Sequence, residues 1–249
     1  YRGLFGAQNT VAIDGMGYTA DCPNWMDTPL SSIPQSLTSS VTLYRGLGSV
    51  DSMAEGLGGG ISISSRRGDF AAGDEWSSYG YAEGGYGSNA SGRGAVVFAG
   101  MHNHDNWIDL ATSSDQADNY EFDGGVVAAS GYDRSQYRFG YGRRIGAAEL
   151  IVGAVANRTG PSGTPALPMD MRYVDSEQYS VEFAAPTGPG RLALQAGTLS
   201  IAHMMDNFTL RPPPLNAMGR PNYRQSDPTG DTDTAQLAYT MEPGWGQLV

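Results

Sequence analysis

Four side chains with soft ligand atoms occur as two short pairs along the sequence. Cys22 and Met26 are four residues apart, so one turn or a tight loop can aim both sulfur atoms at one point. His203 and Met205 are two residues apart, which places both on one face of a strand. A thiolate, two thioethers and an imidazole form a soft set that selects Cu(I) over magnesium or calcium. Taken singly, each residue is more commonly a packing residue, and zinc stays open through Cys22 and His203.

Further histidines, methionines and acids fall in or near segments that we interpret as loops. Two histidines form an auxiliary metal site or are simply solvated. Three methionines form a low-affinity capture path for copper or have no ligand role. Four acids raise the local cation concentration or serve only solubility. These residues are His102, His104, Met169, Met171, Met218, Asp105, Asp109, Asp115 and Asp118.

The elements that position these residues are strands, because apolar and polar residues alternate along many segments. The alternation predicts antiparallel strands with one face toward lipid and one face inward. The predicted lipid-facing residues are Tyr137, Phe139, Tyr141, Tyr179, Val181, Phe183, Leu192, Leu194 and Ala196. Gln195, Gly197, His203 and Met205 are predicted to face inward.

The connections between these strands alternate in length. Short turns are predicted at 87–92, 144–147 and 186–190, and long loops at 104–125, 159–175 and 206–231. Short turns on one side and long loops on the other are typical of an outer-membrane β-barrel. A soluble β-sandwich is the alternative, although it would rarely carry several loops this long.

The composition excludes several classes of protein. The chain has 249 residues with 15 arginines, no lysine, 26 acids and a net charge of -11, which argues against nucleic-acid binding. The single cysteine excludes an internal disulfide framework. No catalytic Ser/His/Asp arrangement is recognisable, so we do not expect an enzyme. Because Tyr1 is neither an initiator methionine nor part of a signal sequence, we expect a processed chain or a piece of a longer one.

The N-terminal third carries a distinctive order of motifs. The segment Val11–Ala12–Ile13–Asp14–Gly15 is predicted as a strand that runs into a turn, and Ser40 to Arg45 as a second strand. A glycine cluster at 56–60 precedes a third predicted strand, Ile61–Ser62–Ile63. Together with the alternating strands behind it, this order resembles the plug and barrel of TonB-dependent outer-membrane receptors. The resemblance implies a β fold in which residues 1–70 are the C-terminal part of a plug domain. Residues 71–249 would then be the first strands and extracellular loops of an antiparallel transmembrane β-barrel.

The two soft pairs carry a narrower resemblance. The segment Cys22–Pro23–Asn24–Trp25–Met26–Asp27–Thr28–Pro29 looks like the plug loop of TonB-dependent copper receptors, with Trp25 and Thr28 departing from the usual residues. The segment His203–Met204–Met205–Asp206–Asn207 looks like the barrel motif with which that loop is paired. The resemblance implies one metal site formed by Cys22, Met26, His203 and Met205.

As the resemblance implies, the protein captures copper, as Cu(I), at the bacterial outer membrane and imports it. Its partners would be the outer-membrane lipid and the inner-membrane TonB complex, which pulls on the plug through an N-terminal box missing from this sequence. The alternation predicts about seven strands, whereas plugged barrels of this class have about 22. We therefore expect an incomplete barrel. Two alternatives stay open: a receptor for another ligand such as a siderophore, and a structural or adhesive surface protein that transports nothing.

Overall fold

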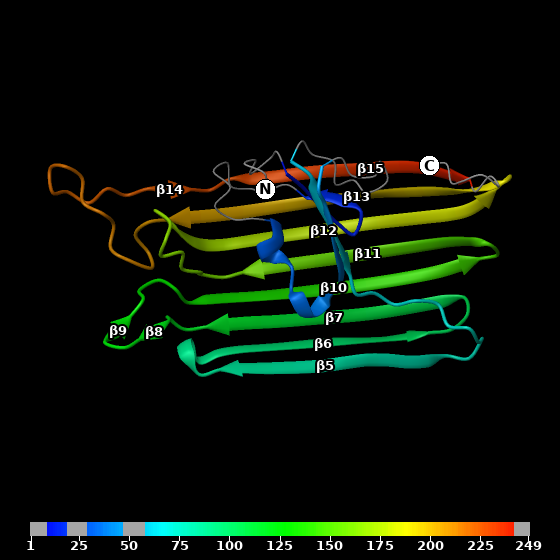
Figure 1. The fold of residues 1–249 in the computed structure, drawn as a ribbon, viewed down its shortest axis with the longest axis horizontal. Coiled ribbons are helices and arrows are strands. Elements are labelled where there is room, and N and C mark those ends of the chain that lie inside the picture. Colours follow the sequence, from blue (N-terminus) through cyan, green and yellow to red (C-terminus); the bar gives the residue numbers. More distant parts are fainter. Residues whose placement is uncertain (1–8, 19–28, 47–57, 242–249) are drawn as a thin grey trace.

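The computed structural model describes residues 9–18, 29–46 and 58–241, which form two main sheets (Figure 1). The smaller sheet has four strands in the order β2-β1-β4-β3. These strands are β1 (Thr10–Ile13), β2 (Met16–Tyr18), β3 (Thr38–Tyr44) and β4 (Gly60–Ser65). Two 3-10 helices, η2 (Pro29–Ser32) and η3 (Gln35–Leu37), precede β3. The sequence-predicted strands in this region are thus confirmed.

A two-residue turn joins β1 to β2. Asp14 and Gly15 both have positive φ angles, 51° and 75°, which a tight hairpin turn requires and which glycine adopts without strain. The Asp14 carboxylate accepts hydrogen bonds from the backbone N–H and the hydroxyl of Ser65, each at 2.7 Å. The Asp14 carbonyl accepts a further hydrogen bond from the side chain of Gln195, which fixes the turn to the larger sheet.

The larger sheet has nine strands, of which eight are long. Every strand in it runs antiparallel to its neighbours. Its edges within the described residues are β5 and, on the other side, β15 and the short β14. The strands are β5 (Ser77–Gly87), β6 (Gly92–His102), β7 (Asn106–Ala117), β10 (Tyr132–Ile145), β11 (Ala148–Thr159), β12 (Asp170–Thr187), β13 (Gly190–Asp206), β14 (Gln225–Ser226) and β15 (Thr229–Met241).

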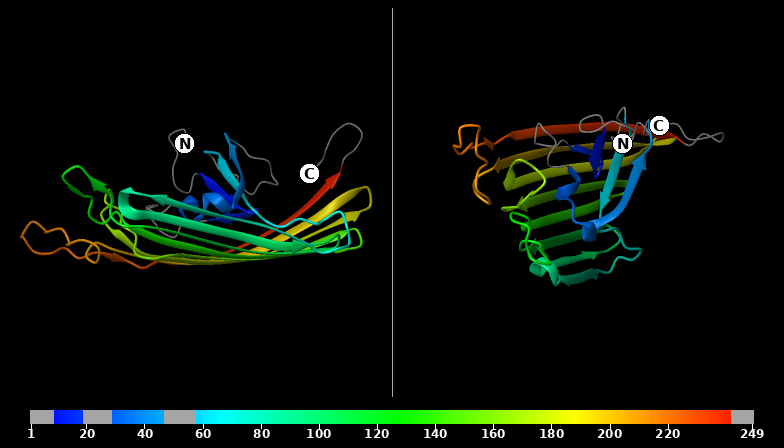
Figure 2. Two further views of the ribbon diagram at one scale, coloured as in Figure 1. Left: turned by 90° about the horizontal axis from the view of Figure 1, so that it is seen from below. Right: turned by 60° about the vertical axis from the view of Figure 1, so that its left-hand side comes forward.

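The larger sheet curves into a trough, and the smaller sheet lies on its concave side (Figure 2). We call the concave side the inner face and the convex side the outer face. The predicted alternation is confirmed, because Tyr137 and Tyr179 are exposed on the outer face whereas Gln136 and Gln178 are buried on the inner face. No helix among the described residues is long and apolar enough to cross a membrane.

The predicted long loop at 104–125 is wrong. Residues 106–117 form β7, and the long connection follows it at 118–131, where β8 (Glu121–Phe122) and β9 (Gly125–Val126) form a small hairpin. The sequence does not reveal β7 because its inward residues include Asp109 and Ser113, which give the segment the polarity of a loop. With this extra strand, the larger sheet has eight long strands among the described residues, whereas about seven were expected.

With β7 in place, the connections sort by length onto the two ends of the sheet, except that the predicted short turn at 87–92 lies at the end with the long loops. At one end, which we call the long-loop end, lie 118–131, 160–169 and 207–228, together with the short η5 turn (Asn89–Ser91). At the other end, the short-turn end, lie 103–105, 146–147 and 188–189. Figure 1 shows the long-loop end at its left and the short-turn end at its right.

An apolar cluster joins the two sheets. Val11, Ile13 and Tyr18 of the smaller sheet are buried with Val174 of β12 and with Leu199 and Ile201 of β13. Burying each large apolar side chain contributes about 1.5–3 kcal/mol. The smaller sheet is therefore held chiefly against β12 and β13.

Candidate functional site

His203 and Met205 lie near the end of β13, on its inner face and at the long-loop end of the sheet. Each is only 1% exposed, although both belong to a strand whose outward residues Ala202 and Met204 are partly exposed. The period of two places the imidazole and the thioether on one face, as the sequence predicts. The inner face at this position therefore presents a nitrogen and a sulfur donor side by side.

A third soft donor faces the same way because of an irregularity in β12. Met171 is the cross-strand partner of Met205, whereas Tyr173 partners Met204, so the register shifts at Arg172. A bulge of this kind turns the residues before it onto the opposite face. It brings Met171 to the inner face, where it packs against the apolar cluster. Met169, close by, is 9% exposed.

Two buried acids fix the strand ends beside this site. Asp206 and Asp170 are cross-strand partners and both are fully buried. Asp206 lies 3.1 Å from the Arg172 guanidinium, and Asp170 lies 2.9 Å from the guanidinium of Arg211 in the 207–228 connection. Breaking a buried pair of this type is costly, because it leaves a charge without compensation. The first pair therefore ties β12 to β13, and the second ties the 207–228 connection to β12.

Asp206 is the last residue of β13, at the long-loop end of the sheet. It lies ten residues beyond Ala196, the last residue of the outward-facing apolar stretch Leu192 to Ala196. Burial alone would raise its pKa, but hydrogen bonds from the Thr209 hydroxyl and from the backbone amides of Phe208 and Thr209, with the Arg172 contact, hold the pKa below its usual range. The carboxylate thus stays ionised and organises the turn after β13. Sequence reasoning gave Asp206 and Arg172 no structural role, although Asp206 directly follows Met205 in the sequence.

The other half of the predicted ligand set, Cys22 and Met26, lies outside the described residues. The residues that flank this segment are described. Tyr18, four positions before Cys22, belongs to the apolar cluster that contains Leu199 and Ile201, and Ile33 packs against the same cluster. The chain on both sides of the segment is therefore anchored beside the part of β13 that leads to His203.

The remaining predicted candidates do not join this site. His102 ends β6 and His104 follows it, so both lie at the short-turn end, not beside a long loop as expected. His102 Nδ1 lies 2.7 Å from the Asp69 carbonyl oxygen, and His104 Nδ1 lies 2.7 Å from Asp105. Met218 is 76% exposed in a long connection.

The predicted group of acidic loop residues is also corrected. Asp109 and Asp115 belong to the strand β7 and face inward, and Asp105 lies in a short connection. Only Asp118 lies in a long connection. Within the described ranges, no group of three or more His, Cys, Asp or Glu side chains is arranged to hold a metal ion.

Neither the protein-family models nor the curated proteins give a match to this sequence. Among solved structures, the chain is similar to the copper transporter OprC, with a TM-score of 0.82 and 23% sequence identity. The similarity covers 96% of this chain and 37% of that chain, so the present chain spans well under half of OprC. At this identity the likeness shows a shared fold.

Proposed function

We propose that this chain is part of a TonB-dependent outer-membrane receptor that captures copper and imports it. Cys22, Met26, His203 and Met205 are the proposed ligands. The observation that carries the proposal is the burial of His203 and Met205 on the inner face, at the long-loop end of a sheet that shares its fold with a copper transporter. Residues 1–70 would be the later part of the plug and 71–249 the first part of the barrel.

Chain geometry is compatible with one shared site. An extended chain spans at most about 3.6 Å per residue, so Cys22 lies within about 14 Å of Tyr18. Met26, three residues before Pro29, lies within about 11 Å of that residue by the same limit. Tyr18 belongs to the cluster that contains Ile201, and Ile33 packs against the same cluster. The segment that carries Cys22 and Met26 therefore begins and ends near the part of β13 that leads to His203, which supports the proposal of one shared site.

The proposed donors suit copper in charge as well as in softness. Two thioethers and a neutral imidazole carry no charge, and the Cys22 thiolate carries one negative charge. With Cu(I) the set is neutral, which lowers the cost of holding an ion where water is excluded. A divalent ion would leave a net positive charge, and magnesium or calcium would also lack the oxygen ligands that they prefer.

The same proposal orients the sheet in a membrane. The exposed apolar side chains of the outer face, among them Leu110 and Tyr179, would contact lipid. The long connections would lie outside the cell and the short turns in the periplasm, the arrangement usual for outer-membrane barrels. Copper would then enter from the end at which His203 and Met205 lie, and the TonB complex would act from the opposite end.

Copper content tests this function directly. The full-length receptor and its variants Cys22→Ser, Met26→Ala, His203→Ala and Met205→Ala would be purified in parallel and assayed by mass spectrometry. Cys22→Ser should lose most of the tightly bound copper, because it removes the only anionic ligand. Met26→Ala should weaken binding less, since a neighbouring thioether or water replaces a neutral ligand at lower cost.

Met218→Ala is the matched control, because Met218 is exposed and should leave the copper content unchanged. Wild-type copper content in Cys22→Ser would overturn the site. In that case the alternative function, a receptor for another ligand such as a siderophore, would replace the proposed one. Copper uptake that persists in a strain without TonB would favour a surface protein with no energised transport role.

A further inference from the structure

A large cavity lined by polar and apolar residues lies on the inner face, and one of its lining residues, Ile33, also packs against the apolar cluster. Its volume is about 920 Å³, and it lies between the η2–η3 segment and the inner face of β5, β6, β7, β10 and β11. This size is within the range of small-molecule sites in proteins. The proposed copper ligands among the described residues, His203 and Met205, do not line it.

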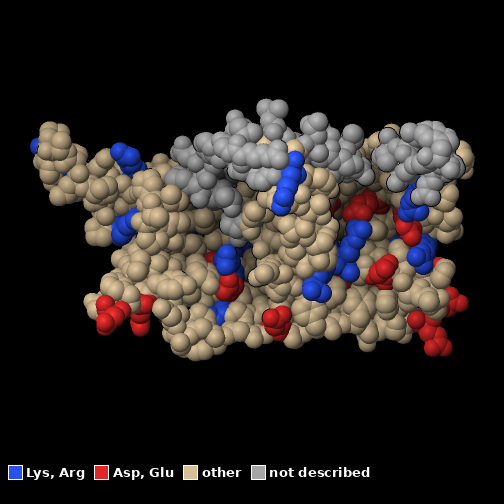
Figure 3. Space-filling view, in the orientation of Figure 1, with Lys and Arg blue, Asp and Glu red and all other residues tan. Residues whose placement is uncertain are grey.

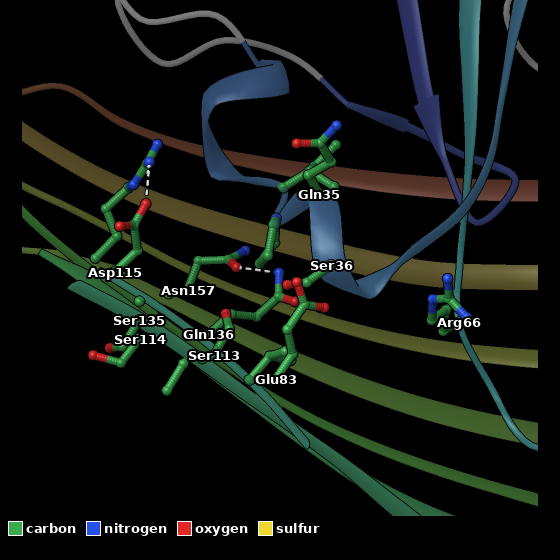
Figure 4. A pocket seen from close by; sticks show the side chains of 18 of the residues that line it. Gln35, Ser36, Arg66, Glu83, Ser113, Ser114, Asp115, Ser135, Gln136 and Asn157 are labelled. Atoms are coloured by element: carbon green, nitrogen blue, oxygen red, sulfur yellow. Dashed lines mark hydrogen bonds and ion pairs between the residues drawn. The ribbon is translucent and has the colours of Figure 1, made fainter. Parts of the chain in front are cut away.

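Two charged groups on this cavity have no charged partner of their own. The Arg66 guanidinium forms no hydrogen bond or ion pair with any residue in the described ranges. It lies over the Tyr81 ring, 5.4 Å from the ring centre. The Glu83 carboxylate likewise has no hydrogen-bond or ion-pair partner in that part of the chain. Figure 4 shows Glu83 pointing toward Ser36 and Gln136, with Arg66 standing at the other side of the cavity.

Two other charged groups at or beside the cavity are paired. Arg134 lies 2.6 Å from Asp115 on the same cavity, and Arg67 lies 2.8 Å from Glu182 just outside it. Figure 3 shows arginines and acids next to one another in parts of this face, near its centre and its right-hand side. Arg66 and Glu83 are both exposed, so this unpaired guanidinium and carboxylate are accessible to a ligand that carries both opposite charges.

Neutral polar groups line the space between these charges. Ser113 is 8% exposed, and its hydroxyl has no hydrogen-bond partner among the described residues. The side chains of Gln35 and Ser36 also line the cavity. Behind them, Gln136 donates to Asn157 at 2.6 Å and Asn157 donates to Ser176 at 2.9 Å, a chain that stiffens the wall. Such groups suit the amide N–H and C=O groups of a peptide backbone.

The geometry points to a binding site for a short zwitterionic peptide: we propose that Arg66 binds its carboxylate and Glu83 its ammonium group. Tyr81 fixes the spacing, because its hydroxyl donates to the Ser36 carbonyl oxygen at 2.6 Å while Arg66 lies over its ring. Glu83 is two residues further along β5, about 7 Å from Tyr81 between Cα atoms. The two charges are thus on the order of 10 Å apart, about the length of three extended residues.

Trialanine is the probe. Binding to the full-length receptor in detergent would be measured by calorimetry, beside N-acetyl-trialanine, trialanine amide and free alanine. Each blocked peptide lacks one terminal charge and should bind about tenfold or more weakly, because hydrogen bonds to charged groups are the strong ones. Free alanine, which is too short to span both charges, should also bind more weakly. Equal binding of the blocked and unblocked peptides, or no binding of trialanine, would overturn the inference.

The variants Arg66→Gln and Glu83→Gln should each weaken trialanine binding about tenfold. Arg67→Gln is the matched control, since Arg67 is adjacent in sequence but paired with Glu182. An equal loss in Arg67→Gln would show a structural effect and refute the site. Copper content of the same samples separates this inference from the proposed function, because neither Arg66 nor Glu83 is a proposed copper ligand.

Discussion

The inner face of the large sheet has two halves that hold the smaller sheet by different means. Along β12 and β13, Val174, Leu199 and Ile201 pack against apolar residues of β1 and β2. Along β5 to β7, Leu37 of η3 is buried in a second apolar cluster with Val96, Phe98 and Ala111. Polar contacts add to it there, such as Tyr81 to the Ser36 carbonyl and Asp109 to the Gly68 amide. We call the side along β12 and β13 the apolar half and the side along β5 to β11, where polar contacts and a cavity accompany the second cluster, the polar half.

The two halves differ in rigidity and in the free space that they leave. Apolar packing excludes water and fixes positions, which suits a site whose ligands come from two separate parts of the chain. The polar half keeps a cavity, because serine and amide side chains tolerate water that an apolar wall would exclude. The proposed copper site lies next to the first half and the proposed peptide site lies in the second.

The largest expected effect follows from a cavity made in the apolar half. Leu199 is 1% exposed, so Leu199→Ala should lower the free energy of unfolding by about 2–5 kcal/mol. It should also loosen the smaller sheet. Denaturant titration of the full-length protein in detergent, followed by protease digestion, measures both effects. A loss below about 1 kcal/mol would mean that this cluster does not hold the two sheets together.

A smaller effect is expected from crowding in the polar half. Trp107 is buried on the inner face, and a Cβ at Gly142 would overlap the Nε1 and Cε2 atoms of its indole. Gly142→Ala should therefore displace the indole and cost about 1–3 kcal/mol. Tryptophan fluorescence should shift toward that of an exposed ring, and Gly146→Ala, which tests a turn glycine at φ 61°, should leave that fluorescence unchanged. An unshifted spectrum in Gly142→Ala would contradict this packing.

The smallest effect is expected at the cavity wall. Ser113→Ala removes a hydroxyl that has no hydrogen-bond partner among the described residues, so stability should change by less than about 0.5 kcal/mol. The same denaturant titration measures it. A loss comparable with that of Leu199→Ala would remove the contrast between the two halves.

The strands and their faces could be predicted from the sequence because the period of two is a local property. The alternation at 136–141 and 178–183 assigned inward and outward residues correctly, and the i, i+2 spacing put His203 and Met205 on one face. The same logic failed for β7, since inward positions on a polar inner face are themselves polar. Asp109 and Ser113 made a buried strand resemble a solvated loop.

By itself the sequence determined the all-β class, the alternating faces and the two soft pairs, all of which depend on near neighbours in the chain. Only the tertiary structure decided that Met171 joins Met205 on the inner face, because the register shift at Arg172 depends on how β12 pairs with β13. The tertiary structure also decided that Arg67 forms an ion pair and that Arg66 does not, although the two residues are adjacent and chemically identical. One of them finds Glu182 across 115 residues and the other does not, because pairing of charges depends on which distant residues the fold brings within reach.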